Sequence, residues 1–175
     1  MKYKYSNKKY NVIGYGSLIN KKSFKKTLTK RSFKLIIIKG YKRIFDLAIF
    51  GSKRENALNI KKSPKHNFNA ILFKVTEKEL ANLKTREVEY NIEEEWAYNF
   101  KTNKKLCKSF IFIDPFIAID KSNKNPYKSY FILCREGAYE LGKDFGKYWD
   151  ETTYTSSGKK ISNWLKKNKL YDTKP

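Results

Sequence analysis

The stretch from Asn11 to Ile19, with the sequence Asn-Val-Ile-Gly-Tyr-Gly-Ser-Leu-Ile, has residues suited to binding an anion. An apolar, strand-like segment leads into a turn where Gly14 and Gly16 permit positive φ and a close approach of a ligand to the backbone. A helix that begins near Ser17 or Asn20, with either side chain as its N-cap, would direct free N–H groups and the positive end of its dipole into this turn. The turn could therefore bind a phosphate or a developing oxyanion. The alternative is a glycine turn that only closes a core strand.

A second candidate is Glu87, at the end of a segment with a clear helix start. Thr76 can be the N-cap, and Glu79, three residues later, completes a capping box. Leu80 and Leu83 face inward at a spacing of three, and Glu87 lies one turn past Leu83 on the same side. A carboxylate is not expected on an apolar helix face unless it has a task, so Glu87 is a candidate catalytic group.

Other residue types that commonly carry catalysis are sparse. The single histidine, His66, lies in a Pro-Lys-His-Asn context typical of an exposed turn, so neither a zinc site nor a Ser-His-Asp triad is expected. Ser17 would need a base other than histidine to act as a nucleophile. The remaining clustered carboxylates are interpreted as a solvated strand or turn: Glu89, Glu93, Glu94 and Glu95. The prediction includes no metal and no cofactor.

The two cysteines indicate a reduced, intracellular protein. Cys107 and Cys134 belong to no Cys-x-x-Cys pair, which favours buried thiols over a disulfide scaffold. The apolar run after the basic N-terminus is short and broken by glycines, unlike a signal peptide. No apolar stretch approaches the length of a membrane span. We therefore expect a soluble, cytoplasmic protein that does not act at a membrane.

The charge of the chain allows two interpretations. A formal net charge of +22 raises the possibility of an anionic partner, nucleic acid above all. Only five basic residues are arginine, however, and lysine is spread along nearly the whole chain. Arginine is the usual residue for reading base edges, so a diffusely basic, solvated surface is favoured over a dedicated nucleic-acid site.

The pattern of elements predicts an α+β protein with one domain over residues 10–168, preceded by a lysine-rich lead-in (1–9) and followed by a tail (169–175). In chain order the predicted elements are a helix over 21–30, strands over 33–38 and 41–50 with a turn at Lys39-Gly40, a polar loop over 51–69 with Pro64 and a short strand near 57–60, a strand over 70–75, the helix over 76–87, strands over 90–100 and 106–113, a loop over 120–125, a helical run over 130–149, and a small helix over 159–169 after a turn at Ser157-Gly158. Gly137, Gly142 and Gly146 weaken the helical run and allow close packing.

Several of these segments together resemble the γ-glutamylcyclotransferase-like family, over roughly residues 10 to 168. The specific parts are the Gly-Tyr-Gly-Ser-Leu turn at 14–18 and the segment Leu80-Ala-Asn-Leu-Lys-Thr-Arg-Glu87. Further similar segments are Gly40-Tyr-Lys-Arg-Ile-Phe45, Ala70-Ile-Leu-Phe-Lys-Val-Thr76, Asn125-Pro-Tyr-Lys-Ser-Tyr130 and Thr152-Thr-Tyr-Thr-Ser-Ser-Gly158. At Leu18, Lys84 and Val88 the chain departs from residues common in the family, so the resemblance implies a reaction class and not one substrate.

The resemblance implies a mixed β-barrel with short flanking helices and a cavity at one end. It implies an enzyme that cyclises a γ-glutamyl group to 5-oxoproline and releases an amine or amino acid, without metal or cofactor. Glu87 would be the general acid/base, the backbone of Gly16, Ser17 and Leu18 the oxyanion site, and Tyr15 and Tyr130 the residues that orient the substrate. With 13 tyrosines in the chain, a core position is the alternative for Tyr130. The alternative function is a non-catalytic protein of the same cavity fold that binds a small ligand, or nucleic acid through its basic surface.

Overall fold

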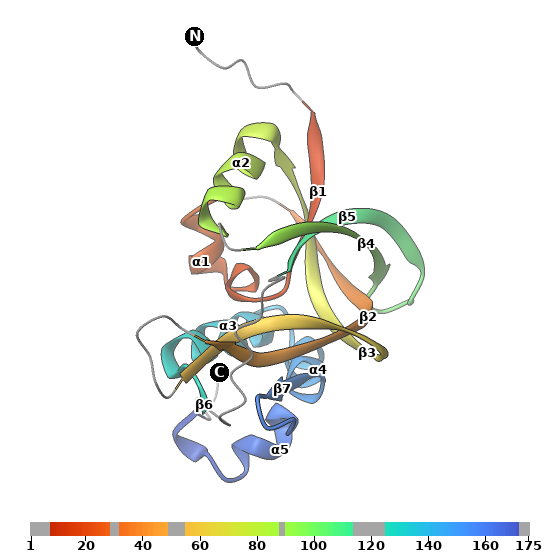
Figure 1. The fold of residues 1–175 in the computed structure, drawn as a ribbon. Coiled ribbons are helices and arrows are strands. Elements are labelled where there is room, and N and C mark those ends of the chain that lie inside the picture. Colours follow the sequence, from red (N-terminus) through yellow and green to blue (C-terminus); the bar gives the residue numbers. More distant parts are fainter. Residues whose placement is uncertain (1–7, 29–31, 49–54, 88–89, 114–124, 172–175) are drawn as a thin grey trace.

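The computed structural model describes residues 8–28, 32–48, 55–87, 90–113 and 125–171, which form a mixed sheet with short helices (Figure 1). The strands are β1 (Lys9–Gly14), β2 (Phe33–Ala48), β3 (Glu55–Thr76), β4 (Asn91–Asn99), β5 (Lys105–Ile113), β6 (Asn125–Pro126) and β7 (Thr153–Thr155). Their order in the sheet is β6-β3-β1-β5-β4-β2-β7, with β2 and β3 also paired to each other. The predicted strands over 70–75, 90–100 and 106–113 are confirmed within β3, β4 and β5.

The strand pairings form a ring with a long extension. β3 pairs with β1, β1 with β5, β5 with β4, β4 with β2, and β2 with β3 again. The β2–β3 pairing then continues from Tyr41 opposite Lys62 to Ala48 opposite Asn56, where β7 and β6 add to it. Figure 1 shows β2 and β3 running together from the ring toward α3, α4 and β7. The α+β class is as predicted. The sheet is not a strict barrel, because the paired strands β2 and β3 extend beyond β1, β4 and β5.

The predicted turn at Lys39-Gly40 is wrong, because β2 is one strand that passes through it. Gly40 has φ of +81°, and the register with β3 shifts between Lys39 and Tyr41. A glycine at positive φ accommodates such a bulge without ending the strand. Both halves of β2 therefore stay paired with the same neighbour.

The predicted loop over 51–69 is also wrong where the structure describes it, since β3 begins at Glu55. Pro64 lies in the interval between Lys62 and Asn67, where the register with β2 is interrupted. A bulge tolerates proline because no ladder hydrogen bond needs its missing N–H. This part of β3 was not predicted as a strand because its polar residues do not alternate with apolar ones.

The helices α1 and α2 each begin directly after a residue whose side chain caps them. η1 (Ser17–Ile19) is a 3-10 turn, and α1 (Lys21–Lys25) is capped by Asn20, whose side chain accepts from the N–H groups of Lys22 and Ser23. α2 (Glu77–Arg86) has the predicted capping box: Thr76 accepts from the N–H of Glu79, and the carboxylate of Glu79 accepts from the N–H of Thr76. Leu80 and Leu83 are buried, as predicted.

The predicted helical run over 130–149 is two helices, α3 (Lys128–Glu140) and α4 (Lys143–Thr152). Gly142, at φ of +133°, separates them, since this conformation is costly for any other residue. A buried ion pair joins the two helices: Nε of Arg135 lies 3.0 Å from Oδ1 of Asp150. The predicted turn before residue 159 is confirmed by Gly158, at φ of +78°, and is followed by α5 (Ile161–Leu165) and η2 (Lys169–Tyr171).

Gly137 brings α3 against the glycine turn. A Cβ on Gly137 would lie 2.6 Å from Cα and 2.7 Å from the nitrogen of Asn20, so only glycine fits at this contact. The helix backbone therefore packs directly on the residue that caps α1. This contact fixes where the N-terminal turn of α3, including Tyr130, lies relative to η1.

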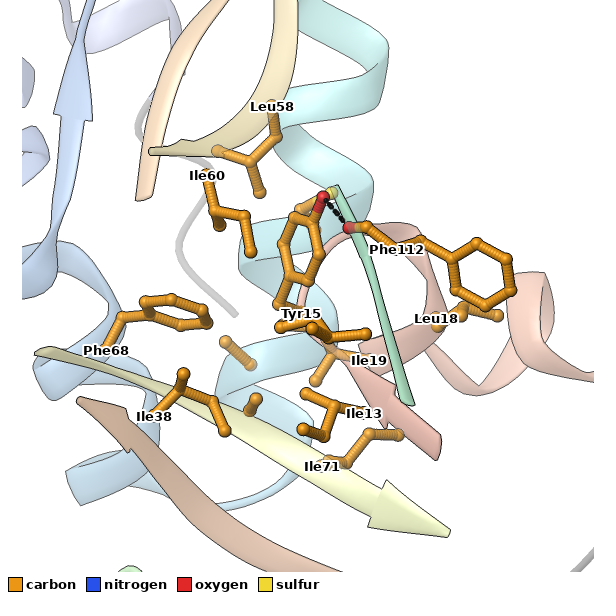
Figure 2. Packing of buried hydrophobic residues seen from close by; sticks show 14 of the residues in the cluster. Ile13, Tyr15, Leu18, Ile19, Ile38, Leu58, Ile60, Phe68, Ile71 and Phe112 are labelled. Atoms are coloured by element: carbon orange, nitrogen blue, oxygen red, sulfur yellow. Dashed lines mark hydrogen bonds between the residues drawn. The ribbon is translucent and has the colours of Figure 1, made fainter. Parts of the chain in front are cut away.

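The core contains a second buried cation, Arg43, besides Arg135. Figure 2 shows Tyr15 among apolar side chains from β1, β2 and β3. Arg43, on β2, is fully buried; its Nε donates to Oγ1 of Thr153 at 2.8 Å and its Nη1 to the carbonyl of Asn69 at 2.6 Å. Nη2 of Arg43 donates to Oδ1 of Asn69 at 2.8 Å. The guanidinium thus holds β3 and β7 against β2 through neutral acceptors.

Some predictions fall on residues that the structure does not describe: most of the lead-in (1–9), the end of the helix over 21–30, most of the loop over 120–125, the end of the tail, Val88 and Glu89. Among the described residues, no helix is long and apolar enough to cross a membrane.

Candidate active site

The glycine turn is a strand-to-helix junction. β1 ends at Gly14, and the N–H groups of Ile19 and Asn20 donate to the carbonyls of Gly16 and Ser17 at 3.0 and 3.1 Å. The N–H groups of Ser17 and Leu18 are the first of this 3-10 turn and have no carbonyl partner inside it. Asn20 and not Ser17 is the side-chain cap.

Close approach, and not positive φ, explains the glycines of this turn. Gly16 has φ of −105°, and the described glycines at positive φ are Gly40, Gly142 and Gly158, so that expectation for Gly14 and Gly16 is wrong. A Cβ on Gly14 would lie 2.9 Å from Cβ of Leu18, and one on Gly16 would lie 2.8 Å from the hydroxyl of Tyr130. The turn is therefore tight against its own helix and against α3.

Glu87 lies at the C-terminal end of α2 and faces this turn. Its N–H donates to the carbonyl of Leu83 at 2.9 Å, and its side chain is 22% exposed. Burial raises the pKa of the Glu87 carboxyl above its ordinary value, while the charge of Arg86 opposes that shift. A carboxyl of this kind accepts and returns a proton closer to neutral pH than a solvated one.

Arg86 lies beside the site and was not predicted from the sequence, and neither were Leu58, Tyr90 and Phe112, which line the cavity. Its Nε lies 3.2 Å from Oε1 of Glu87, and its Nη2 donates to Oγ of Ser17 at 2.8 Å. Its Nη1 donates to Oγ1 of Thr27 at 2.7 Å, and its Nη2 also donates to Oγ of Ser23 at 3.1 Å. One guanidinium therefore ties the end of α2 to both η1 and α1. The only signal in the sequence was its position beside Glu87.

Tyr15 forms the inner wall of the site. It is 8% exposed, and its hydroxyl donates to the carbonyl of Phe112 at 2.9 Å, the bond drawn in Figure 2. This bond joins the turn after β1 to the end of β5. The ring of Tyr15 packs edge-on against Phe68, with the ring centroids 5.9 Å apart.

Tyr130 closes the opposite side. Its hydroxyl lies over Gly16, and Cys134, one turn along α3, lies close enough to Tyr130 to influence its pKa. Burial raises the pKa of Tyr130 well above its ordinary value, and the nearby Cys134, Tyr90, Tyr15 and Glu87 add to this. Tyr130 is therefore a neutral hydroxyl that can act as a donor.

These side chains enclose one small cavity. All six predicted site residues line it: Tyr15, Gly16, Ser17, Leu18, Glu87 and Tyr130. Its volume is about 40 Å³, close to the space of a single water molecule and far below the ~300–1,000 Å³ of typical small-molecule pockets. The structure thus brings the predicted residues together around one small, partly open cavity.

The residues predicted to be outside the site do not line this cavity. His66 lies in β3 and not in a turn, with its Nδ1 2.7 Å from Oγ of Ser63 and its ring against Tyr154. Glu93 and Glu95 accept hydrogen bonds from the hydroxyl of Tyr41 on the sheet. Cys107 and Cys134 are both free thiols, and burial raises the pKa of Cys134 to about 12. In the described parts of the chain, no three His, Cys, Asp or Glu side chains cluster as metal ligands would.

Comparisons with known proteins identify the fold through similar solved structures. No family model matches the sequence, and no curated protein matches it. The structure matches a γ-glutamyl cyclotransferase with a TM-score of 0.66 at 15% identity, covering 91% of this chain and 99% of that one. The chain has the γ-glutamyl cyclotransferase fold. An uncharacterized human protein also matches, with a TM-score of 0.65 at 14% identity and coverage of 94% and 99%. A yeast γ-glutamyl cyclotransferase specific to glutathione gives 0.59 at 11% identity, with coverage of 90% and 97%.

The γ-glutamyl cyclotransferase fold confirms the resemblance read from the turn at 14–18 and from the segment ending at Glu87. Both matched enzymes are covered almost from end to end, so the likeness extends over nearly the whole fold. At these identities the similarity establishes the fold, and the chemistry has to be argued from the residues of this chain.

Proposed function

We propose that the protein is a γ-glutamylcyclotransferase-like enzyme that converts a γ-glutamyl amine or amino acid into 5-oxoproline and the free amine. The α-nitrogen of the glutamyl group attacks its own γ-carbonyl carbon, and the new C–N bond closes the five-membered ring. The bond from that carbon to the nitrogen of the leaving amine breaks. The proton lost by the α-nitrogen passes to Glu87 and then to the leaving nitrogen, so the step balances without a further reactant.

The proposal rests on one observation: Glu87 and the turn from Tyr15 to Leu18 line the same cavity. A free α-amino group has a pKa near 8, so a carboxylate whose own pKa is raised by burial is a suitable base. The developing negative charge on the γ-carbonyl oxygen needs preorganised donors. The N–H groups at the start of η1 suit that role, each worth on the order of 3 kcal/mol.

The proposed reaction requires the cavity to widen. At about 40 Å³ it is too small for a γ-glutamyl group, and the hydroxyl of Tyr130 lies directly over Gly16. Tyr130 lies in the first turn of α3 and is only partly buried, so a rotation of this side chain is the simplest opening. In the opened site its hydroxyl would remain within reach of the substrate and could orient it.

The test is to incubate the purified protein with a series of γ-glutamyl amino acids and γ-glutamyl amines and to measure 5-oxoproline by mass spectrometry. Glu87→Gln keeps the shape of the side chain and removes the base, so turnover should fall by about 100-fold or more. Glu94→Gln, a carboxylate exposed on β4, is the matched control and should retain full activity. The absence of 5-oxoproline from every compound, or equal activity of the two variants, would contradict the proposal.

A further inference from the structure

A hydroxyl group of the glycine turn has an unused proton beside the cavity at Glu87. Ser17, the first residue of η1, lines this cavity, and its Oγ accepts a hydrogen bond from Nη2 of Arg86 at 2.8 Å. An arginine N–H can only donate, so this bond does not use the hydroxyl proton of Ser17. Among the described residues, no group accepts that proton. The proton is therefore available to a ligand in the cavity.

Arg86 holds this hydroxyl but has no donor left for a ligand. Its Nε lies 3.2 Å from Oε1 of Glu87, and its Nη1 donates to Oγ1 of Thr27 at 2.7 Å and to the carbonyl of Ser23 at 3.4 Å. Its Nη2 donates to Ser17 and, at 3.1 Å, to Oγ of Ser23. Each nitrogen of the guanidinium is thus directed at a protein oxygen. Arg86 acts on the cavity through the two neighbours that line it, Glu87 and Ser17.

The bond from Arg86 makes the hydroxyl of Ser17 a stronger donor. A hydrogen bond from a charged group is shorter and stronger than a neutral one, and hydrogen bonds in a chain polarise one another. The oxygen of Ser17 is also held in place, because Arg86 is itself fixed by α1 and by Glu87. A fixed donor of this kind stabilises a negative charge that develops in the cavity without having to reorganise.

The reacting amide has one atom that needs such a donor. Its carbon bears the attacking α-nitrogen, the leaving nitrogen and the γ-carbonyl oxygen. The two nitrogens exchange their proton through Glu87, so the oxygen, which gains negative charge as the ring closes, is the atom left for Ser17. We propose that the hydroxyl of Ser17 is a catalytic donor to this γ-carbonyl oxygen, alongside the backbone N–H groups of the turn.

This role rests on the proposed cyclotransferase reaction and adds no reactant to it. Ser17 keeps its proton throughout, and no bond to its Oγ forms or breaks. The proton of the α-nitrogen still passes to Glu87 and then to the leaving nitrogen. The α-carboxylate of the substrate is the other group that could accept from Ser17, but it carries its charge before the reaction begins. A donor to it would therefore strengthen binding and would not speed the chemical step.

The experiment measures kcat and KM for the γ-glutamyl compound that the unaltered protein converts fastest to 5-oxoproline. Ser17→Ala removes the hydroxyl and leaves the backbone N–H in place. We expect kcat to fall by about 100-fold with little change in KM, because one donor to the transition state is lost. Ser17→Thr keeps the hydroxyl and should recover most of the activity that Ser17→Ala loses.

Ser23→Ala is the matched control. Oγ of Ser23 accepts from the same Nη2 of Arg86, but Ser23 does not line the cavity. This variant takes an acceptor from the guanidinium without removing a hydroxyl from the site, so it should keep most of its kcat. The acid limb of the kcat/KM profile is a second readout. It should stay in place in Ser17→Ala, because the contact of Arg86 with Glu87 remains.

Three results, each with an active unaltered protein, would overturn the role of Ser17 alone. They are similar kcat values in Ser17→Ala and Ser23→Ala, a raised KM of Ser17→Ala at unchanged kcat, and a γ-glutamyl ester on Ser17 in the mass spectrum of the intact protein. The second would place the hydroxyl at the α-carboxylate, and the third would make it a nucleophile. If the unaltered protein forms no 5-oxoproline, the proposed reaction fails and this role fails with it.

Discussion

Nε of Arg86 lies 3.2 Å from the carboxylate of Glu87, and Nη2 of the same guanidinium donates to Oγ of Ser17 at 2.8 Å. The candidate base and the candidate oxyanion turn are therefore held by one side chain, although they are about 70 positions apart in sequence. Arg86 does not line the cavity, so we assign it as a positioning residue. It sets where the carboxylate of Glu87 lies and lowers the pKa that burial raises.

Replacement of Arg86 should shift the pH dependence of the proposed reaction. A general base must be ionised, so kcat/KM falls as pH falls through the pKa of Glu87. Arg86→Gln removes the cation that lowers this pKa, so the acid limb of the profile should move to higher pH. The measurement is kcat/KM for 5-oxoproline formation across the acid range.

Arg86→Lys is the control for this shift, because it keeps the positive charge and loses the forked donors. Its acid limb should stay close to that of the unaltered protein, even if kcat is lower. An acid limb that is identical in Arg86→Gln and the unaltered protein would mean that Glu87 is not the group being titrated.

Local signals in the sequence predicted the local parts of the site. The capping box of Thr76 and Glu79 and the inward faces of Leu80 and Leu83 determine α2, and α2 determines where Glu87 points. These depend on residues three or four apart, which periodicity detects. The turn at 14–18 was predicted from two glycines that permit close approach to the backbone, and that part of the argument is what the structure supports.

The features that were missed depend on contacts distant in sequence. The contacts of Arg86 with Ser17 and Ser23 and of Arg43 with Thr153 join residues 63 to 110 positions apart, and no spacing in the sequence indicates them. The errors in β2 and β3 have the same origin. Gly40 and Pro64 are turn residues locally, but each lies at a register shift in a hairpin whose pairing continues on both sides.

The contact of Gly16 with Tyr130 can be tested by a double-mutant cycle. A Cβ on Gly16 would lie 2.8 Å from the hydroxyl oxygen of Tyr130 and no closer than 3.9 Å to its next neighbour. Because the obstructing atom is the end of a side chain that can rotate, Gly16→Ala should lower the free energy of unfolding by about 1 kcal/mol, the low end of the usual cost of overpacking. Tyr130→Phe removes the obstructing oxygen, so the double variant should recover most of that loss in urea unfolding. Strictly additive effects would show that the two residues are not in contact.

Arg43 should be essential to stability through its hydrogen bonds. Burial lowers the pKa of the guanidinium to about 9. Its N–H groups donate hydrogen bonds to the neutral side chains of Thr153 and Asn69. Arg43→Met keeps apolar bulk but leaves these buried acceptors unpaired, so we expect a loss of about 2–4 kcal/mol in the free energy of unfolding. Lys65→Met, on the exposed part of β3, is the control and should lie within about 0.5 kcal/mol of the unaltered protein. Similar midpoints for the two variants in urea would contradict this role.

The raised pKa of Glu87 also predicts how stability depends on pH. Since the folded-state pKa lies above the unfolded-state value, the folded protein holds more protons between them, and stability falls as pH rises through that window. Glu87→Gln lacks this titration, so its free energy of unfolding relative to the unaltered protein should increase as pH rises from below the ordinary carboxyl pKa toward neutral. Urea unfolding at a series of pH values measures this difference, with Glu94→Gln as the control that should show no such trend. A relative stability of Glu87→Gln that falls with pH would mean that Arg86 outweighs burial and that the carboxyl is too acidic to serve as the base.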